Sequence, residues 1–189
     1  MKYAILLVAC ALPLAACKKS PEVNEKNASV AEVAEAVRES GGNDAFVRPG
    51  KWQSTVTIEE FEVPGLPPEM AQRMKQTMAQ YQERSFETCL TKDEAKRPKE
   101  DFFTGKGGDN CRYDHFKMGS GKIDAMMRCG GDSGAGKQVM QMAGSYSPNS
   151  YDMKMSMKQE GGEGTAAGMT MTMKIDAKRT GECDAKAQG

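Results

Sequence analysis

The stretch "CRYDHFKMGSGKIDAMMRC", residues 111–129, decides how the chain is expected to fold. Its centre, Gly119-Ser120-Gly121, is rich in glycine, which is typical of a tight turn between antiparallel strands. A hairpin folded about Ser120 places Cys111 directly opposite Cys129, with the two Cβ atoms within reach of a disulfide. The sequence therefore predicts a β-hairpin that is closed by this disulfide.

The remaining cysteines predict a second disulfide. Cys10 and Cys17 lie in an N-terminal export segment, which leaves Cys89 and Cys183 as an even pair for an oxidising compartment. A zinc site made of four thiolates is the alternative, but the sequence contains no C-x-x-C spacing. The expected metal and cofactor content is none.

Further strand-like runs follow the hairpin and precede it. Runs separated by glycine-rich or Pro-Asn turns predict sequential antiparallel strands, at 111–118, 122–129, 137–146, 150–158 and 168–179. The alternation in "KWQSTVTIEEFEV", residues 51–63, predicts an earlier strand, and Met70, Met74 and Met78 recur at helical spacing just after it. We expect a mainly β fold, an antiparallel meander forming a small sandwich or barrel-like sheet. We also expect one amphipathic helix that covers a face or an open end of the sheet, and two disulfides that cross-link the fold.

The N-terminus reads as an export signal. Lys2 precedes an apolar run that is too short to span a bilayer, and small residues follow it. Leu14-Ala15-Ala16-Cys17 resembles the lipobox of bacterial lipoproteins, which implies lipidation of Cys17 after removal of residues 1–16. Lys18 then stands where an aspartate would favour retention in the inner membrane, so the resemblance implies an outer-membrane lipoprotein facing the periplasm. Ordinary cleavage near Ala16 is the alternative.

The expected organisation has four parts. A signal peptide (1–16) is followed by a lipidated N-terminus and tether (17–48), an antiparallel β domain (49–183) and a C-terminal tail (184–189). Within the tether, "ASVAEVAEAVRES" predicts either disorder or a short helix with one apolar face, formed by Val30, Val33, Ala34 and Val37.

Methionine recurs at period two in "MKMSM", residues 153–157, and in "MTMTM", residues 169–173. This period places each set on one face of a sheet. A loop centred on Glu163 predicts that Met153 faces Met173, Met155 faces Met171 and Met157 faces Met169. A turn at Pro148-Asn149 predicts that Met142 lies opposite Met155 and Met140 opposite Met157.

Several interpretations of this methionine face compete. Methionine fills adaptable cores and hydrophobic pockets, and the lysine and threonine residues between the methionines suit a solvated opposite face. Thioether clusters are also soft ligands for Cu(I), and exposed methionines can be oxidised sacrificially. We favour a core or a hydrophobic pocket, including a pocket for a lipid or a peptide.

Composition and motifs argue against other classes. The chain has 26 basic and 26 acidic residues. It therefore lacks the excess of positive charge that is typical of nucleic-acid-binding proteins. The chain has one histidine, His115, in the middle of an expected strand, which disfavours a catalytic triad. "GGDSG" around Ser133 weakly resembles the nucleophile stretch of serine proteases, so a serine hydrolase is a remote alternative.

The residues together resemble the exported bacterial family known as domain of unknown function 3617. The similar features span residues 47–183: Pro49-Gly50-Lys51-Trp52, Cys89-Leu90-Thr91, Cys111, Cys129, Gly144-Ser145-Tyr146, the methionine strands and Gly181-Glu182-Cys183. The resemblance implies no activity, cofactor or catalytic residue. We therefore expect a non-catalytic envelope lipoprotein that is attached to the membrane by lipid and binds a hydrophobic ligand or an envelope protein.

Overall fold

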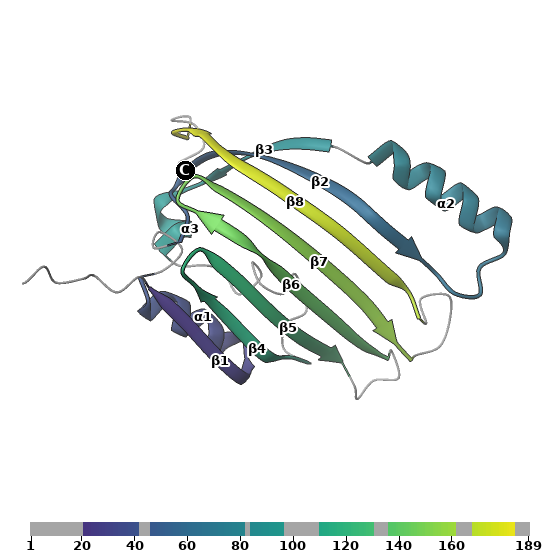
Figure 1. Ribbon diagram of the computed structural model, residues 1–189, viewed down its shortest axis with the longest axis horizontal. Helices are drawn as coiled ribbons and strands as arrows, with labels where there is room; N and C mark the ends of the chain where they lie inside the picture. The colour runs from purple at the N-terminus through teal and green to yellow at the C-terminus, as the bar shows by residue number, and fades with distance from the viewer. Residues whose placement is uncertain are drawn as a thin grey trace, which may run out of the picture.

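The computed structural model describes residues 21–41, 46–81, 84–96, 110–130, 136–161 and 168–183. These residues form one sheet in which all pairings are antiparallel, in the order β1-β4-β5-β6-β7-β8-β2-β3 (Figure 1). The elements are β1 (Glu22–Ser29), α1 (Val30–Glu39), β2 (Gly50–Glu62), α2 (Pro68–Tyr81), β3 (Arg84–Leu90), α3 (Lys92–Lys96), β4 (Cys111–Gly119), β5 (Lys122–Gly130), β6 (Lys137–Ser147), β7 (Ser150–Glu160) and β8 (Thr170–Gly181). None of the helices in these residues is both long and apolar enough to cross a bilayer.

The predicted mainly β, antiparallel class is confirmed. The sheet is a single open one with β1 and β3 at its edges, rather than two packed sheets. Both predicted disulfides form, with Cα–Cα distances of 5.5 Å for Cys89–Cys183 and 4.0 Å for Cys111–Cys129. Thr91 and Glu94 also form the reciprocal hydrogen bonds of a helix cap at the start of α3.

A bulge in β4 allows the Cys111–Cys129 pair to form. The turn leaves Gly119 opposite Lys122, and continuing that register would place Cys111 opposite Gly130. The register shifts by one residue between Tyr113 and His115, and Cys111 then meets Cys129. The same shift explains why Tyr113 and Phe116, three residues apart, are both buried on one face.

The expected tether over residues 17–48 contains folded structure, which is a correction. Residues 22–29 form the edge strand β1 beside β4, and α1 follows at once. Ser29 caps α1, accepting a hydrogen bond from the backbone of Glu32 while the Glu32 carboxylate accepts one from the backbone of Ser29. The predicted helix face is confirmed, because Val30, Val33, Ala34 and Val37 are its buried residues. The folded region therefore begins before residue 49.

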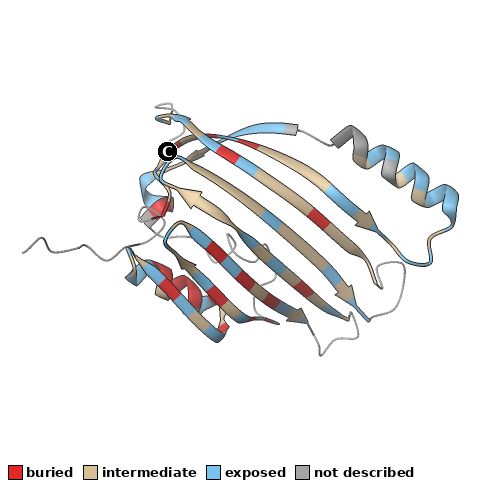
Figure 2. Ribbon diagram, viewed as in Figure 1, coloured by how far each residue is buried: buried red, intermediate tan, exposed pale blue. Residues whose placement is uncertain are grey.

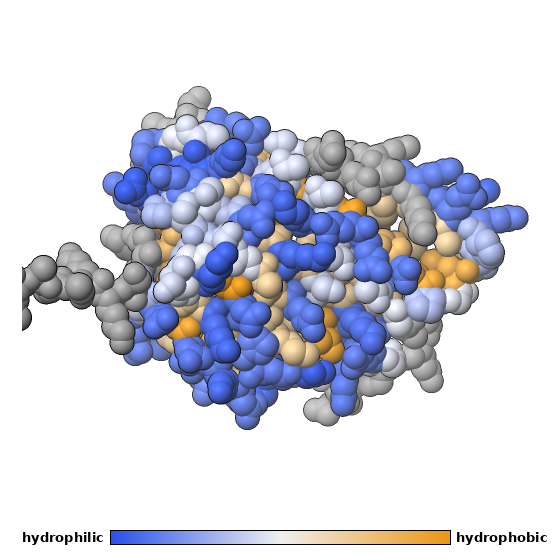
Figure 3. All heavy atoms as spheres, in the orientation of Figure 1, coloured by the Kyte–Doolittle hydropathy of each residue, from blue (hydrophilic) through white to orange (hydrophobic). Residues whose placement is uncertain are grey.

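The two faces of the sheet differ in chemistry. We call the face on which α1 packs the inner face and the opposite one the outer face. The outer face, toward the viewer in Figure 1, is mostly hydrophilic (Figure 3). It carries ion pairs such as Lys154 with Glu59 and Lys174 with Asp152. The hydrophobic core lies between α1 and the inner face of β1, β4 and β5 (Figure 2).

The helix at 68–81 does not cover a face of the sheet, and of the two expected places it takes the one at an end of the sheet, beside the end of β2. α2 extends away from the sheet beyond the end of β2, and Met70 on its apolar side is 55% exposed (Figure 1). The helix that covers the sheet is α1, whose contacts are chiefly with β1 and β4. The reason is the Pro64–Pro67 segment, which carries the chain outward before α2 begins at Pro68.

Candidate functional site

The inner face of β6, β7, β8 and β2 carries the methionines. We call this surface the methionine face; it comprises Met140, Met142, Met153, Met155, Met157, Met171 and Met173, with Val56, Ile58 and Ile175. Side chains alternate between the two faces of the sheet along each strand. Lys154, Ser156 and Lys174, which lie between these residues in sequence, therefore point to the outer face.

The register between β6 and β7 matches the prediction, and that between β7 and β8 does not. Met142 pairs with Met155 and Met140 with Met157, as expected. Across to β8, however, Met155 pairs with Met173 and Met157 with Met171, a shift of two residues from the predicted register. Met153 pairs with Ile175, and Met169 precedes β8. A shift of two preserves the face, so the methionines still share one surface.

This register arranges the thioethers in rows that cross the strands. One row contains Met142, Met155 and Met173 and continues to Ile58 of β2. The next contains Met127, Met140, Met157 and Met171 and continues to Phe61. Neighbours within a row are directly opposite each other on adjacent strands, where Cβ atoms lie about 4.5–5.5 Å apart.

Burial divides the inner face into a sealed half and a half-exposed half. Under α1 and Phe46, the residues Tyr113, Phe116 and Met127 are at most 2% exposed. On the methionine face, Met155, Met157, Met171 and Met173 are only partly buried and do not belong to the core cluster. Figure 2 shows several red bands on β4 and β5, whereas β7 is mostly of intermediate colour and β8 is intermediate apart from bands at Thr172 and Ala177. The sheet thus presents an apolar surface that is not fully packed.

A few polar groups lie on this face. The side-chain amide of Gln138 donates a hydrogen bond to the sulfur of Met157. The hydroxyls of Ser54 and Tyr151 lie 3.5 Å apart at the other end of the strands. Such sparse polar groups on an apolar surface can orient a bound molecule without making the surface hydrophilic.

Aromatic residues close one end of the methionine face. We call this the aromatic end; it is where β2 begins, β8 ends and the β6–β7 turn lies. The Trp52 and Tyr151 rings are 5.5 Å apart, and Phe46 packs edge-on against Tyr146 at the same distance. Trp52 is 3% exposed and donates from Nε1 to the carbonyl of Arg48 at 3.0 Å. On the inner face, the protein's own aromatic side chains therefore occupy this end.

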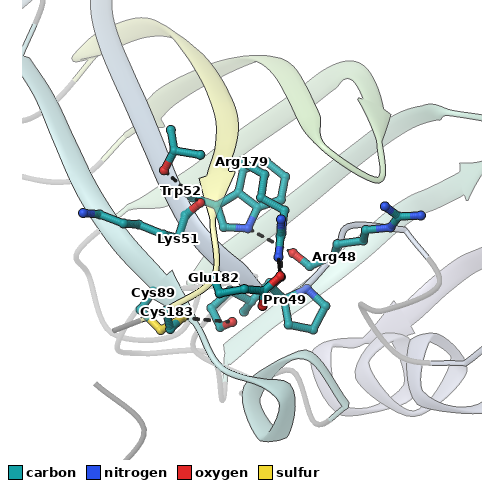
Figure 4. Close-up of polar contacts among 10 residues, drawn as sticks. Arg48, Pro49, Lys51, Trp52, Cys89, Arg179, Glu182 and Cys183 are labelled. Carbon is teal, nitrogen blue, oxygen red and sulfur yellow. Dashed lines mark hydrogen bonds and ion pairs between the residues drawn. A yellow bond between two sulfur atoms is a disulfide. The ribbon is translucent and has the colours of Figure 1, made fainter. Parts of the chain in front are cut away.

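A polar lock fixes the aromatic end (Figure 4). Arg179 of β8 donates from Nε to the carbonyl of Pro49 at 2.7 Å and also pairs with the carboxylate of Glu182. Gly50 has φ +144°, and a Cβ there would lie 2.4 Å from the carbonyl oxygen of Gly181 and 2.5 Å from Arg179 Nε. The nearby Cys89–Cys183 disulfide ties β3 to the end of the chain. Pro49-Gly50-Lys51-Trp52 and Gly181-Glu182-Cys183 thus form one structural unit.

The opposite end of the methionine face borders α2. We call this the far end; it is where β2 ends. A hollow of about 380 Å³ lies there between β2 and α2, lined by Phe61, Glu62, Val63, Pro64, Leu66, Ala71 and Met74. Phe61 belongs both to this hollow and to the row that contains Met171. Through Phe61, the hollow therefore adjoins the methionine face.

The other residues singled out by sequence lie elsewhere. His115 is on the outer face, where its Nε2 is 2.6 Å from a carboxylate oxygen of Asp124. Cys17, Ser133 and Glu163 lie outside the described residues. Within the described part of the chain, no three His, Cys, Asp or Glu side chains gather as metal ligands would.

Electrostatic shifts occur away from the methionine face. Burial raises the pKa of the Tyr113 phenol well above its usual value of about 10. On the outer face, a hydrogen bond from Lys174 is the main cause that lowers the pKa of Asp152, and a hydrogen bond with Asp176 is the next. The carboxylates of Asp152 and Asp176 in turn raise the pKa of Lys174. The cause is burial for Tyr113, and hydrogen bonding and ion pairing for Asp152 and Lys174.

Sequence reasoning missed three contributors to this site. Arg179 carries no motif that marks it as the partner of Pro49. Phe61 lies beyond a second bulge, between Ile58 and Glu60, so simple alternation assigns it to the wrong face. Phe86 of β3, 45% exposed, lies opposite Ser54 and extends the apolar surface to the sheet edge.

Comparisons with known proteins place the chain in a family. Neither a search of curated proteins nor a search of solved structures found a match. A family model described as Protein of unknown function (DUF3617) matches residues 47–183, which contain the polar lock, both disulfides and all strands except β1. The chain therefore belongs to the DUF3617 family.

Proposed function

We propose that this protein is a non-catalytic envelope lipoprotein that binds a hydrophobic ligand on its methionine face. It is anchored through Cys17 to the outer membrane and faces the periplasm. The single observation that carries the binding proposal is the contrast between the two halves of the inner face. The half beneath α1 is sealed, whereas Met155, Met157, Met171 and Met173 on the other half stay partly exposed.

Physical chemistry favours a ligand for such a surface. Exposed apolar area is unfavourable in water at about 25 cal/mol per Å², so a contiguous patch is commonly an interaction site. Methionine has a flexible, polarizable side chain that adapts to irregular partners. The outer face, with its ion pairs, supplies the solvated side of the same strands. A flexible apolar molecule suits this combination.

A probe-binding experiment tests the proposal. A soluble version beginning at Lys18, with both disulfides formed, is titrated with an uncharged naphthylamine dye whose fluorescence rises in apolar surroundings. Met155→Gln is expected to weaken dye binding about tenfold, the effect of losing roughly 1.4 kcal/mol of apolar contact. Lys154→Gln, on the neighbouring position of the outer face, is the matched control and is expected to bind as the parent does. Equal binding by both variants would reject the methionine face as the site.

The anchor has its own test. The support is the run Leu14-Ala15-Ala16-Cys17 after a short apolar segment, which resembles the lipobox of bacterial lipoproteins. Stable attachment needs two or more acyl chains, because a single chain binds only marginally. Metabolic labelling with a palmitate analogue is expected to mark the parent protein in the outer-membrane fraction and to vanish in Cys17→Ala. Label that persists in this variant would refute the assignment.

The non-catalytic character rests on the placement of the one histidine. His115 is paired with Asp124 on the outer face, away from the apolar surface. A serine-reactive phosphonate probe is expected to leave the protein unlabelled. Labelling at Ser133 would support the hydrolase alternative instead.

Cu(I) binding is the second candidate, and the rows of thioethers favour it. Met142, Met155 and Met173 are cross-strand neighbours, as are Met140, Met157 and Met171. Three thioethers form a soft ligand set that selects Cu(I). Anaerobic titration against a chromogenic Cu(I) competitor tests it, because Met155→Leu and Met171→Leu each remove one ligand from a different row. Absence of competition by the parent protein would reject copper and leave the hydrophobic ligand.

A further inference from the structure

The folded sheet begins very close to the proposed lipid anchor. Glu22, the first residue of β1, is only five positions after Cys17 (22 − 17 = 5). A fully extended chain spans at most about 3.6 Å per residue, so this link reaches roughly 18 Å. The start of β1 must therefore stay within that distance of the anchored cysteine.

The start of β1 lies at the aromatic end of the sheet. Glu22 pairs with Gly119, next to the β4–β5 turn. The carbonyl of Gly121 in that turn accepts a hydrogen bond from the backbone of Tyr146, and the β6–β7 turn follows. The carbonyl of Asn149 in this second turn accepts from the backbone of Arg179. One connected edge thus joins the beginning of β1 to the lock at the aromatic end, at the left of Figure 1.

The hollow beside α2 lies at the opposite end of the strands. β2 runs for 13 residues from Gly50 to Glu62. At about 3.3 Å per residue this is roughly 40 Å between the aromatic end and the hollow. Met70, 55% exposed, and Met74, which lines the hollow, both belong to the first turns of α2. Met70, the most exposed large hydrophobic side chain of the described residues, therefore lies at the end of the strands opposite the anchor.

We infer that the short link holds the aromatic end against the anchoring membrane and directs the hollow beside α2 away from it. The inference rests on the lipidation of Cys17 that forms part of the proposed function. A hydrophobic ligand that enters at the hollow then reaches the methionine face from the periplasmic side, rather than from the leaflet that holds the anchor. On the inner face, the rings of Trp52, Tyr151 and Phe46 occupy the aromatic end, whereas the hollow beside α2 lies at the other end.

Energy transfer to the membrane tests this orientation. The full lipidated protein is placed in vesicles of phosphatidylethanolamine and phosphatidylglycerol that contain an acceptor dye on the lipid headgroup. A donor fluorophore is attached through a non-canonical amino acid at Asn149, in the β6–β7 turn, or at Gln72, on the exposed side of α2. With roughly 40 Å between the two ends, transfer from position 149 is expected to exceed that from position 72 at least about twofold.

A lengthened link is the matched control. A flexible Gly/Ser segment of 20 residues inserted between Ser20 and Pro21 has a root-mean-square length of about 25 Å, which frees the domain to turn. In this variant, energy transfer to the membrane is expected to be equal from positions 149 and 72. Equal transfer at both positions in the unmodified protein, or a difference that persists after insertion, would overturn the inference.

The experiment separates this inference from the proposed function. A protein that is not lipidated fails to sediment with the vesicles, and that result would reject both the proposed anchor and the inferred orientation. A protein that is oriented as inferred but does not bind the naphthylamine dye leaves the orientation standing and rejects the ligand proposal alone.

Discussion

Replacing Gly50 with alanine should destabilise the protein far more than replacing Gly65 with alanine. Gly50 has φ +144°, a conformation that residues with a side chain rarely adopt and that costs about 1–3 kcal/mol. The added Cβ would lie 2.5 Å from Arg179 Nε, and it must displace the guanidinium from the carbonyl of Pro49. A hydrogen bond from a charged group contributes about 1.5–3 kcal/mol. The two effects together predict a loss of roughly 3–5 kcal/mol in the free energy of unfolding.

Gly65→Ala is the matched control. Gly65 has φ +81°, but no atom lies within 4 Å of the position that a Cβ would take. Its replacement therefore carries the conformational cost alone, about 1 kcal/mol or slightly more. The difference between the two variants reports chiefly the close contacts of the Gly50 Cβ with Arg179 and Gly181 at the aromatic end.

Urea unfolding of the soluble version with intact disulfides is the assay. Trp52, the one tryptophan of the chain, reports directly on the aromatic end through its fluorescence. Linear extrapolation gives the free energy of unfolding for the parent and both variants. If Gly50→Ala lies within about 1 kcal/mol of Gly65→Ala, the lock is not a major source of stability and the reasoning fails.

Three further predictions concern stability. In the chain-entropy model, replacing both Cys89 and Cys183 with serine lowers the free energy of unfolding by roughly 4–5 kcal/mol, and replacing both Cys111 and Cys129 lowers it by about 3 kcal/mol. The reason is the length of the closed loops, which span 94 and 18 residues. A larger loss for the Cys111–Cys129 pair in urea unfolding would contradict this. Burial raises the pKa of Tyr113, so above about pH 10 the unfolded chain loses a proton that the folded protein keeps, and stability falls as pH rises. Tyr113→Phe should reduce that fall between pH 9 and pH 11, and an unchanged slope would show that Tyr113 is not responsible. Ser29→Ala removes the cap of α1 and should cost about 1 kcal/mol by thermal or urea unfolding; a loss below a few tenths would mean that α1 is held by packing alone.

Much of the sheet could be predicted because its strands alternate cleanly. The hairpin of β4 and β5, the β6–β7 pairing and both disulfides follow from the spacing of cysteines, glycines and apolar residues. The β7–β8 register could not be predicted in the same way. "MKMSM" and "MTMTM" repeat with period two, so a shift of two residues presents an identical pattern, and only contacts in three dimensions distinguish the alternatives.

Irregular backbone within the strands explains the other differences. The sequence does not predict the strand β1, because its buried residues, Val23 and Ala28, are five positions apart. Asn27, which lies between them, has a positive φ of 49°. That backbone conformation breaks the alternation on which strand prediction depends. The extra residue near Glu59 likewise hides Phe61 from a period-two analysis. The methionine face could be predicted as a surface, whereas its half-exposure depends on where α1 and α2 lie.

The central claim is that the methionine face binds a hydrophobic ligand, and methyl NMR tests it most directly. The soluble version is labelled with ¹³C at the methionine methyl groups, and each signal is assigned by replacing one methionine with leucine. A neutral long-chain monoacylglycerol is then added below its aggregation concentration. Saturable shifts at Met155, Met157, Met171 and Met173, with none at the sealed Met127, are the predicted result. Shifts that never saturate, or that leave these four methyl groups unchanged, would contradict the claim.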